Sequence, residues 1–292
     1  MVLIRGGTFR MGSQRFYPEE RPVRTVAVED FWIDVTCVTN AAFATFVRDT
    51  GYATWSEREA VRLPGQDRAV LGSMVFARPS AGPGPSDQSY AWSFVEGACW
   101  HRPLGPGSDL AGLDQHPVVH VAYADACAYA RWAGKALPTE AQWEYAARGG
   151  LDGAEYTWGD VLEPDGWVLA NYWQGVFPHE NTLKDGWERT SPTGCFPPNG
   201  YGLLDMIGNV WEWTSTPWHL PGVARGGCCE LKGEASENEP PAPGVGAGGT
   251  RVIKGGSHLC AKNYCQRYRP AARHPQDVDS PTGHIGFRCV RF

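Results

Sequence analysis

The segment FPPNGYGLLDMIGNVWEWT, at residues 196–214, says most about how this chain folds. Proline, glycine and asparagine recur every few positions, so the apolar residues never reach the spacing of a helix face. The same segment carries large aromatic side chains, among them Trp211 and Trp213, and such side chains must be buried or used in binding. This combination predicts an ordered loop that packs onto a core.

The rest of the chain after residue 150 has the same character, and we expect no helix there. Residues 251–256 and 286–292 read as strands. Residues 226–249 form a low-complexity stretch rich in glycine and proline, which we expect to be a mobile loop.

More regular signals lie before residue 150. We expect three helices, namely one that begins at Thr39 or Asn40 and stops at Gly51, one over about 124–133, and one that opens with the capping box Thr139-Glu-Ala-Gln142 and runs to about Arg148. We expect strands over 3–11, 24–33 and, briefly, 118–121, whereas residues 90–112 read as irregular but packed.

The composition places residues 1–292 in one loop-rich α+β domain with few helices and small antiparallel sheets. Hydrophobic residues make up 42% and charged residues 20%, which is a globular balance, and 36 glycines and 23 prolines require many turns. No apolar run approaches the ~18 residues of a membrane helix. A net charge of −6 without a basic block argues against a nucleic-acid partner.

Nine cysteines, an odd number, cannot all pair within the chain. The N-terminal sequence MVLIRGGTFRMG lacks the apolar core of a signal peptide, so we expect a cytoplasmic protein. In a reducing compartment thiols are more often free, metal-binding or catalytic than paired. The vicinal Cys228 and Cys229 lie in the expected mobile loop and read as exposed free thiols.

The first candidate site is CAKNYC at residues 260–265, which follows KGGS at residues 254–257. Cys260 and Cys265 can converge if the chain turns between them, and convergent thiolates suit Cu(I) or redox chemistry. The spacing is not that of a zinc ribbon. Taken alone it favours a short-loop disulfide or two unrelated core thiols.

Two further candidates are loops rich in side-chain oxygen. The sequence NYWQG at residues 171–175 is followed by DGW at 185–187, and Asp205 and Glu212 lie in the segment quoted first. Carboxylates, amides and backbone carbonyls in loops suit a hard cation such as Ca²⁺. Turns and loop caps without a cation account for these residues equally well.

Several long blocks of this sequence resemble the formylglycine-generating enzymes, also called sulfatase-modifying factors. The blocks are GGTFRMGS, HPVVHVAYADACAYARWAGKALPTEAQWEYAARGG, ANYWQGVFP, FPPNGYGLLDMIGNVWEWT, KGGSHLCAKNYCQRYRPAAR and GFRC. They run nearly from end to end, and the segment Gly-Gly-Ser-x-x-Cys-x4-Cys marks the generating enzyme itself. The resemblance implies a C-type-lectin-like fold.

The resemblance also implies a copper-dependent oxidase. Such an enzyme uses O₂ and a thiol reductant to convert one cysteine of a sulfatase-type protein, within a Cys-x-Pro-x-Arg motif, to Cα-formylglycine. The residues implied for this activity are Cys260 and Cys265 as Cu(I) ligands, Ser257 at the oxygen site, Trp211 near the metal, and Tyr264 and His284 beside the peptide groove.

Two calcium sites follow from the same resemblance. One would be formed by Asn171, the Tyr172 carbonyl, Asp185 and the Trp187 carbonyl, and the other by Asp205, the Gly208 carbonyl, the Val210 carbonyl and Glu212.

The sequence departs from the animal members of the family in three places. Ala261 stands where they carry histidine, residues 281–284 replace serine and asparagine, and their disulfides are not reproduced. Cys127 lies one helical turn from the position of the partner implied for Cys289, which leaves a pairing open. With no extended leader region, these features are expected of a bacterial cytoplasmic enzyme.

Two other functions remain compatible with this kind of fold. A non-catalytic module that binds a peptide or a glycan would not need both Cys260 and Cys265. An iron sulfoxide synthase would need a histidine-rich site and an added helical bundle, for which 292 residues leave no room.

Overall fold

The computed structural model describes residues 1–65, 67–79, 91–219 and 249–292. Its α-helices are α1 (Asn40–Thr50), α2 (Trp55–Arg58), α3 (Tyr123–Trp132) and α4 (Glu140–Arg148), and two short 3₁₀ turns are η1 (Pro18–Glu20) and η3 (Pro164–Gly166). Its strands are β1 (Val2–Ile4), β2 (Gly7–Met11), β3 (Arg24–Val28), β4 (Phe31–Ile33), β5 (Val61–Arg62), β6 (Ala69–Val70), β7 (Gly72–Phe76), β8 (Trp92–Glu96), β9 (Trp211–Pro217), β10 (Thr250–Lys254), β11 (Arg273–Asp277), β12 (Ile285–Gly286) and β13 (Val290–Arg291). The expected mobile loop at 226–249 lies outside the described residues, except for its last position.

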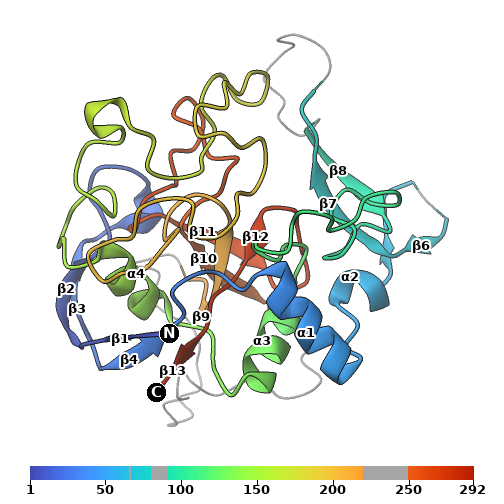
Figure 1. Ribbon diagram of the computed structural model, residues 1–292, viewed down its shortest axis with the longest axis horizontal. Coiled ribbons are helices and arrows are strands. Elements are labelled where there is room, and N and C mark those ends of the chain that lie inside the picture. Colours follow the sequence, from blue (N-terminus) through green and yellow to red (C-terminus); the bar gives the residue numbers. More distant parts are fainter. Residues whose placement is uncertain (66, 80–90, 220–248) are drawn as a thin grey trace, which may run out of the picture.

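A mixed four-stranded sheet lies at the centre, in the order β11-β10-β9-β12 (Figure 1). β10 pairs antiparallel with β9 and β11, whereas β12 runs parallel to β9, so the expectation of purely antiparallel sheets is wrong at this edge. A second sheet, β1-β4-β13, holds the two ends of the chain side by side. Pro275 fits in β11 because an edge strand does not need every N–H for its ladder.

The three expected helices begin and end where the local signals predict, whereas the short α2 was not expected. The Thr39 hydroxyl accepts a hydrogen bond from the Ala42 N–H at the start of α1, and Gly51 ends that helix in the left-handed region at φ 67°. Thr139 and Gln142 form the expected capping box of α4. Side-chain oxygens of this kind satisfy N–H groups that the first turn leaves without a partner.

Several strand expectations need correction. The expected strands 3–11 and 24–33 are each divided in two, into β1 and β2 and into β3 and β4. Residues 118–121 form no strand, because the Val118 N–H bonds to Val38 and the His120 N–H bonds to Thr282, two different segments, and His120 has a φ of 59°. Residues 90–112 are not wholly irregular, since β8 pairs with β7. The irregular segment at 205–213 becomes regular at Trp211, where β9 begins.

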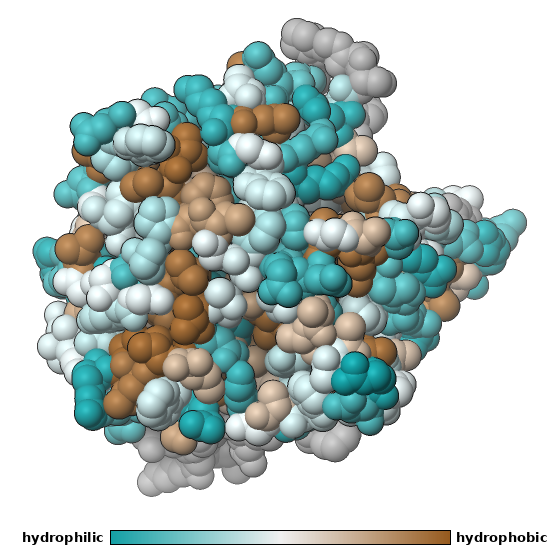
Figure 2. All heavy atoms as spheres, in the orientation of Figure 1, coloured by the Kyte–Doolittle hydropathy of each residue, from teal (hydrophilic) through white to brown (hydrophobic). Residues whose placement is uncertain are grey.

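The interior combines a large aromatic core with buried ion pairs. Phe43, Trp143 and Trp213 are fully buried, and so is the Glu212–Arg288 pair. Apolar residues on the face shown in Figure 2 gather in separate groups between hydrophilic areas. Among the described helices, none has the length and apolar character needed to cross a bilayer.

Candidate active site

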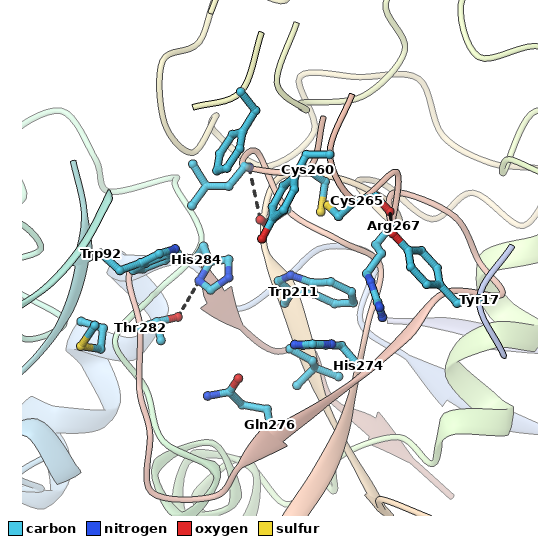
Figure 3. Close-up of a pocket in the computed structure, with 16 residues that line it drawn as sticks. Tyr17, Trp92, Trp211, Cys260, Cys265, Arg267, His274, Gln276, Thr282 and His284 are labelled. Carbon is cyan, nitrogen blue, oxygen red and sulfur yellow. Dashed lines mark hydrogen bonds between the residues drawn. The ribbon is translucent and has the colours of Figure 1, made fainter. Parts of the chain in front are cut away.

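A cavity of about 430 Å³ opens where the central sheet meets the loops that follow β10 and β11. It brings together six residues singled out in the sequence, namely Trp211, Ser257, Cys260, Tyr264, Cys265 and His284. Figure 3 shows Trp211, Cys260, Cys265 and His284 around one space, on several segments. Tertiary folding therefore joins residues 211, 257–265 and 284 in one site.

The two cysteines lie on a tight loop after β10. Gly255 and Gly256 have φ of 93° and 72°, and a Cβ on Gly256 would lie 2.7 Å from the Arg267 carbonyl. Only glycine allows this turn and this close approach. The loop closes with hydrogen bonds from the Cys260 N–H to the Ser257 carbonyl and from the Tyr264 N–H to the Ala261 carbonyl.

Cys260 and Cys265 are both free, so the disulfide alternative does not hold in this structure. Both residues line the same cavity. Burial raises the pKa of Cys260, whereas the interaction with Cys260 lowers the pKa of Cys265 to about 7. The pair therefore favours one thiol and one thiolate near neutral pH, and its two convergent soft donors fit Cu(I).

Aromatic rings form two surfaces of the cavity. Tyr264 stacks on Phe177 with ring centroids 4.6 Å apart and planes 4° from parallel, and 47% of Tyr264 is exposed. Below the cysteines in Figure 3, Trp211 stacks on His274 at 5.8 Å. Flat, half-exposed rings can bind a peptide chain by stacking and apolar contact.

His284 lies on the opposite wall, next to the β7–β8 hairpin. Its Nδ1 is 2.6 Å from the Thr282 hydroxyl, and its ring lies 4.7 Å from that of Trp92 (Figure 3). Burial lowers the pKa of His284 well below its usual value and lowers that of His274 to about 4. Both imidazoles are therefore neutral at physiological pH.

Sequence reasoning missed several polar residues of the cavity, among them Tyr17, Arg267 and His274. Tyr17 donates to the Cys265 carbonyl at 2.9 Å, and the Arg267 guanidinium lies 3.9 Å from the Tyr17 ring. Arg267 also pairs with Glu19 at 2.7 Å. Arg267 lies two residues after Cys265 in the sequence, and this closeness could have identified it as a site residue. No local pattern links Tyr17 to Cys265.

Two residues of the first predicted calcium set, Tyr172 and Asp185, lie close together. The Gln174 Nε2 donates both to the Tyr172 carbonyl and to Asp185 Oδ2, so these two oxygens face the same point. The Asn171 Nδ2 donates to the Arg189 carbonyl. The side-chain oxygen of Asn171 therefore points away from this hydrogen bond. Burial without a basic partner raises the pKa of Asp185. A donor set made of oxygens, with an uncompensated carboxylate, fits Ca²⁺.

The second set fits calcium only in part. Asp205 Oδ1 is buried and has no hydrogen-bond partner among the described residues. Glu212, however, accepts from Trp143 Nε1 at 2.8 Å and from Arg288 Nε at 2.7 Å, and its other oxygen accepts from Arg288 Nη2. The Arg288 charge already neutralises Glu212, so this carboxylate is not available as a calcium ligand.

Cys127 and Cys289, whose pairing the sequence left open, are both free. Cys289 is buried next to Asp34 and Lys135, and burial raises its pKa well above the usual value. Neither residue lines the cavity. They are thiols of the packed interior.

Comparison with known proteins agrees with this site. The chain matches the sulfatase-modifying factor enzyme 1-like domain over residues 1–292. It is 53% identical to the formylglycine-generating enzyme of Mycobacterium tuberculosis, covering 99% of this chain and 97% of the relative. For the Streptomyces coelicolor enzyme of the same name the identity is 47%, covering 99% and 88%.

The chain is also similar to a more distant relative and to a solved structure. A Bos taurus protein named inactive C-alpha-formylglycine-generating enzyme 2 is 37% identical, covering 99% of this chain and 87% of the relative. The structure of PvdO from Pseudomonas aeruginosa matches with a TM-score of 0.60 at 23% identity, covering 99% and 92%, which shows a shared fold. The architecture is thus the C-type-lectin-like fold expected from the sequence, and the chain belongs to the formylglycine-generating enzyme family of sulfatase-modifying factors.

Proposed function

We propose that this protein oxidises one cysteine of a sulfatase-type protein, within a Cys-x-Pro-x-Arg motif, to Cα-formylglycine. The observation that carries the proposal is the pair of free thiols of Cys260 and Cys265 at one open cavity. The names of the relatives at 53% and 47% identity support the same reaction.

The proposed reaction balances with O₂ and two equivalents of a thiol reductant. The substrate CH₂–SH becomes CHO, its sulfur leaves as H₂S, one oxygen atom enters the aldehyde and the other leaves as water. The cysteine supplies two of the four electrons that O₂ takes up, and the two reductant thiols supply the others by forming a disulfide. Cu(I), which Cys260 and Cys265 would hold, supplies one-electron chemistry with O₂.

The residues of the cavity would bind and orient the peptide. Tyr264 and Phe177 present a flat apolar surface, and Trp211 with His274 forms the floor below the cysteines. Ser257 is fully buried and accepts the Leu259 N–H, so its hydroxyl is held at the cavity wall. The neutral imidazoles of His274 and His284 add no positive charge that would compete with bound metal.

A turnover assay followed by mass spectrometry tests the proposal. The protein is loaded with Cu(I) and given a Cys-x-Pro-x-Arg peptide, air and dithiothreitol, and the aldehyde is trapped with a hydrazine. Cys260→Ala and Cys265→Ala should each lower turnover more than about 100-fold, since removing a direct ligand costs more than the 10–100-fold of an outer-shell partner. Cys195→Ala, which removes an exposed free thiol, is the matched control.

Each result of this assay has a clear meaning. Full turnover in Cys260→Ala or Cys265→Ala would contradict the proposal. Tight peptide binding without any turnover, in copper-loaded protein, would instead favour a non-catalytic peptide- or glycan-binding module on the same fold.

We also propose that Asn171, Tyr172, Asp185 and Trp187 hold one Ca²⁺ ion that fixes the loop at residues 171–187. Adding Ca²⁺ to metal-free protein should raise the melting temperature, because an ion that binds only the folded state stabilises it. Asp185→Asn should lose most of this rise, whereas the exposed Asp165→Asn should keep it. An identical rise in both variants would rule out this site.

A further inference from the structure

Three potential metal ligands meet outside the cavity. The His101 Nδ1 lies 3.4 Å from the Cys99 sulfur and 3.6 Å from Glu57 Oε1. The ligand atoms of all three residues lie within 4.8 Å of one another, and none of the three residues lines the cavity. The cluster joins α2, which carries Glu57, to the loop that follows β8.

The loop holds two of these ligands in place through its backbone. Cys99 and Arg102 exchange two backbone hydrogen bonds, at 3.2 and 3.1 Å, which fixes a tight turn. Between the two ligands, Trp100 is buried and packs edge-on against Phe43 at 5.3 Å. The buried indole anchors the turn to the core, so the position of Cys99 and His101 depends on rigid structure.

Glu57 is oriented by a cap. The Thr54 N–H and the Thr54 hydroxyl both donate to Glu57 Oε2, at 3.0 and 2.6 Å. The other oxygen, Oε1, is the one that faces His101. A carboxylate with one oxygen held by a neighbour and the other directed at a histidine has the orientation that outer-shell partners give to metal ligands.

The two separations from His101 Nδ1 to the other ligand atoms fit a tetrahedral ion. Zinc bonds to sulfur, nitrogen and oxygen imply separations of about 3.6 Å for S···N and about 3.3 Å for N···O in a tetrahedral site. The observed 3.4 and 3.6 Å are close to these values. A single hydrogen bond would need only two of these groups, whereas here a thiol, an imidazole and a carboxylate are grouped together.

Solvent can reach this centre from one side. Cys99 is 2% exposed, whereas the side chains of His101 and Glu57 are 37% and 24% exposed. An ion can therefore enter, and water can take a fourth position. We propose that Cys99, His101 and Glu57 bind one Zn²⁺ ion with one open coordination position, and that this ion ties α2 to the loop after β8.

The test uses the full chain with five other cysteines replaced by serine, so that thiolate signals come from fewer sources. The replaced residues are Cys195, Cys228, Cys229, Cys260 and Cys265. One equivalent of Co²⁺ should produce a thiolate-to-cobalt charge-transfer band, and Zn²⁺ should displace it. Zn²⁺ should also raise the melting temperature of this parent chain.

Variants of the three ligands are then compared in that parent. Cys99→Ser should remove the band and weaken Zn²⁺ binding more than about 100-fold, and His101→Gln and Glu57→Gln should weaken it by about 10–100-fold. His219→Gln, a change at an exposed histidine away from the cluster, is the matched control and should bind like the parent.

Several outcomes would overturn the site. They are no band at one equivalent of Co²⁺, a band that survives Cys99→Ser, or parent-like affinity in His101→Gln. If Cys99→Ser does not fold, as judged by circular dichroism, the partly exposed His101 and Glu57 still decide the question, because their variants leave the packed interior unchanged.

Discussion

The helical part of the molecule, with α1, α3 and α4, and the loop-built part that surrounds the cavity are held together differently. In the helical part Phe43 contacts the rings of Phe46, Trp100 and Tyr129. In the loop-built part the interior holds charged side chains such as Arg288 and Glu212, each at most 1% exposed. Apolar packing dominates around α1 and α3, whereas polar side chains with fixed partners are prominent in the second region and also on α4, where Glu144 pairs with Arg148.

The difference follows from where backbone hydrogen bonds go. A helix satisfies its own N–H and C=O groups, so its side chains are free to form an apolar core. Loops cannot do this, and here side chains supply the missing partners. Arg288 donates to the carbonyls of Val35 and Leu204, at 3.0 and 2.9 Å, as well as to Glu212.

Asn199 and Asn209 supply such partners too. The Asn199 Nδ2 donates to the Ala146 carbonyl at the end of α4, and its oxygen accepts from Tyr201. The Asn209 side chain both donates to and accepts from the backbone of Ser191. Leaving a buried polar group without a hydrogen-bond partner costs free energy. These hydrogen bonds therefore favour one particular loop conformation as well as stabilising the fold.

The largest loss of stability is expected when Arg288, which donates to loop carbonyls and to Glu212, is removed. Arg288→Met should lower the free energy of unfolding by about 3–5 kcal/mol, because Glu212 would be left as an uncompensated buried charge. Phe43→Leu, in the helical part, should cost less than about 1.5 kcal/mol, since it keeps an apolar side chain of similar volume. Urea unfolding of both variants checks this, and equal losses would break the comparison.

Acid should weaken the fold next, through buried histidines around the loops. Burial lowers the pKa of His120, His258 and His274 to about 4. In the unfolded chain their pKa is ~6.5, so between pH 6.5 and 4 the unfolded state binds more protons. Each histidine should therefore lower the free energy of unfolding by up to about 1.4 kcal/mol per pH unit as the pH falls through this range.

Urea unfolding at pH 7 and pH 5 measures this loss. His120→Gln should make the free energy of unfolding depend less on pH, because one fewer histidine takes up a proton on unfolding. The variant can also lower stability at pH 7, since it removes the hydrogen bond to Ser73. A stability that stays constant between the two pH values would show that these imidazoles do not stay neutral in the folded protein.

A helix cap should have a smaller effect. Thr139→Ala removes the hydroxyl that accepts the Gln142 N–H at 3.2 Å, and it should cost about 1 kcal/mol. Thr139→Ser keeps the oxygen and should restore most of the loss. Thermal unfolding of the two variants separates the cap from the loss of side-chain volume.

The smallest effect is expected at the surface. Arg68 forms a two-bond ion pair with Glu96, but both side chains are more than half exposed. Such pairs gain little because water and salt screen them. Arg68→Ala should leave the melting temperature unchanged within error, and a clear drop would show that exposed pairs matter here.

Much of the helical part could be predicted because its signals are local. Thr39, Gly51 and Thr139 act within one turn of the residues they cap, so they are readable in a single sequence. β8 and β9 were missed because each becomes a strand through a partner elsewhere in the chain. Residues 118–121 have strand-forming side chains, yet they bond to two segments that no local pattern identifies.

For the candidate site, the motif at residues 254–265 determined the loop itself, since its glycines, serine and cysteines act within a few positions of one another. Only the tertiary structure decided what that loop faces. Tyr17 reaches Cys265 across 248 residues, and His284 lies against Trp92 from another hairpin. Contacts over such distances form when the whole chain packs its core, because their geometry depends on every segment between them.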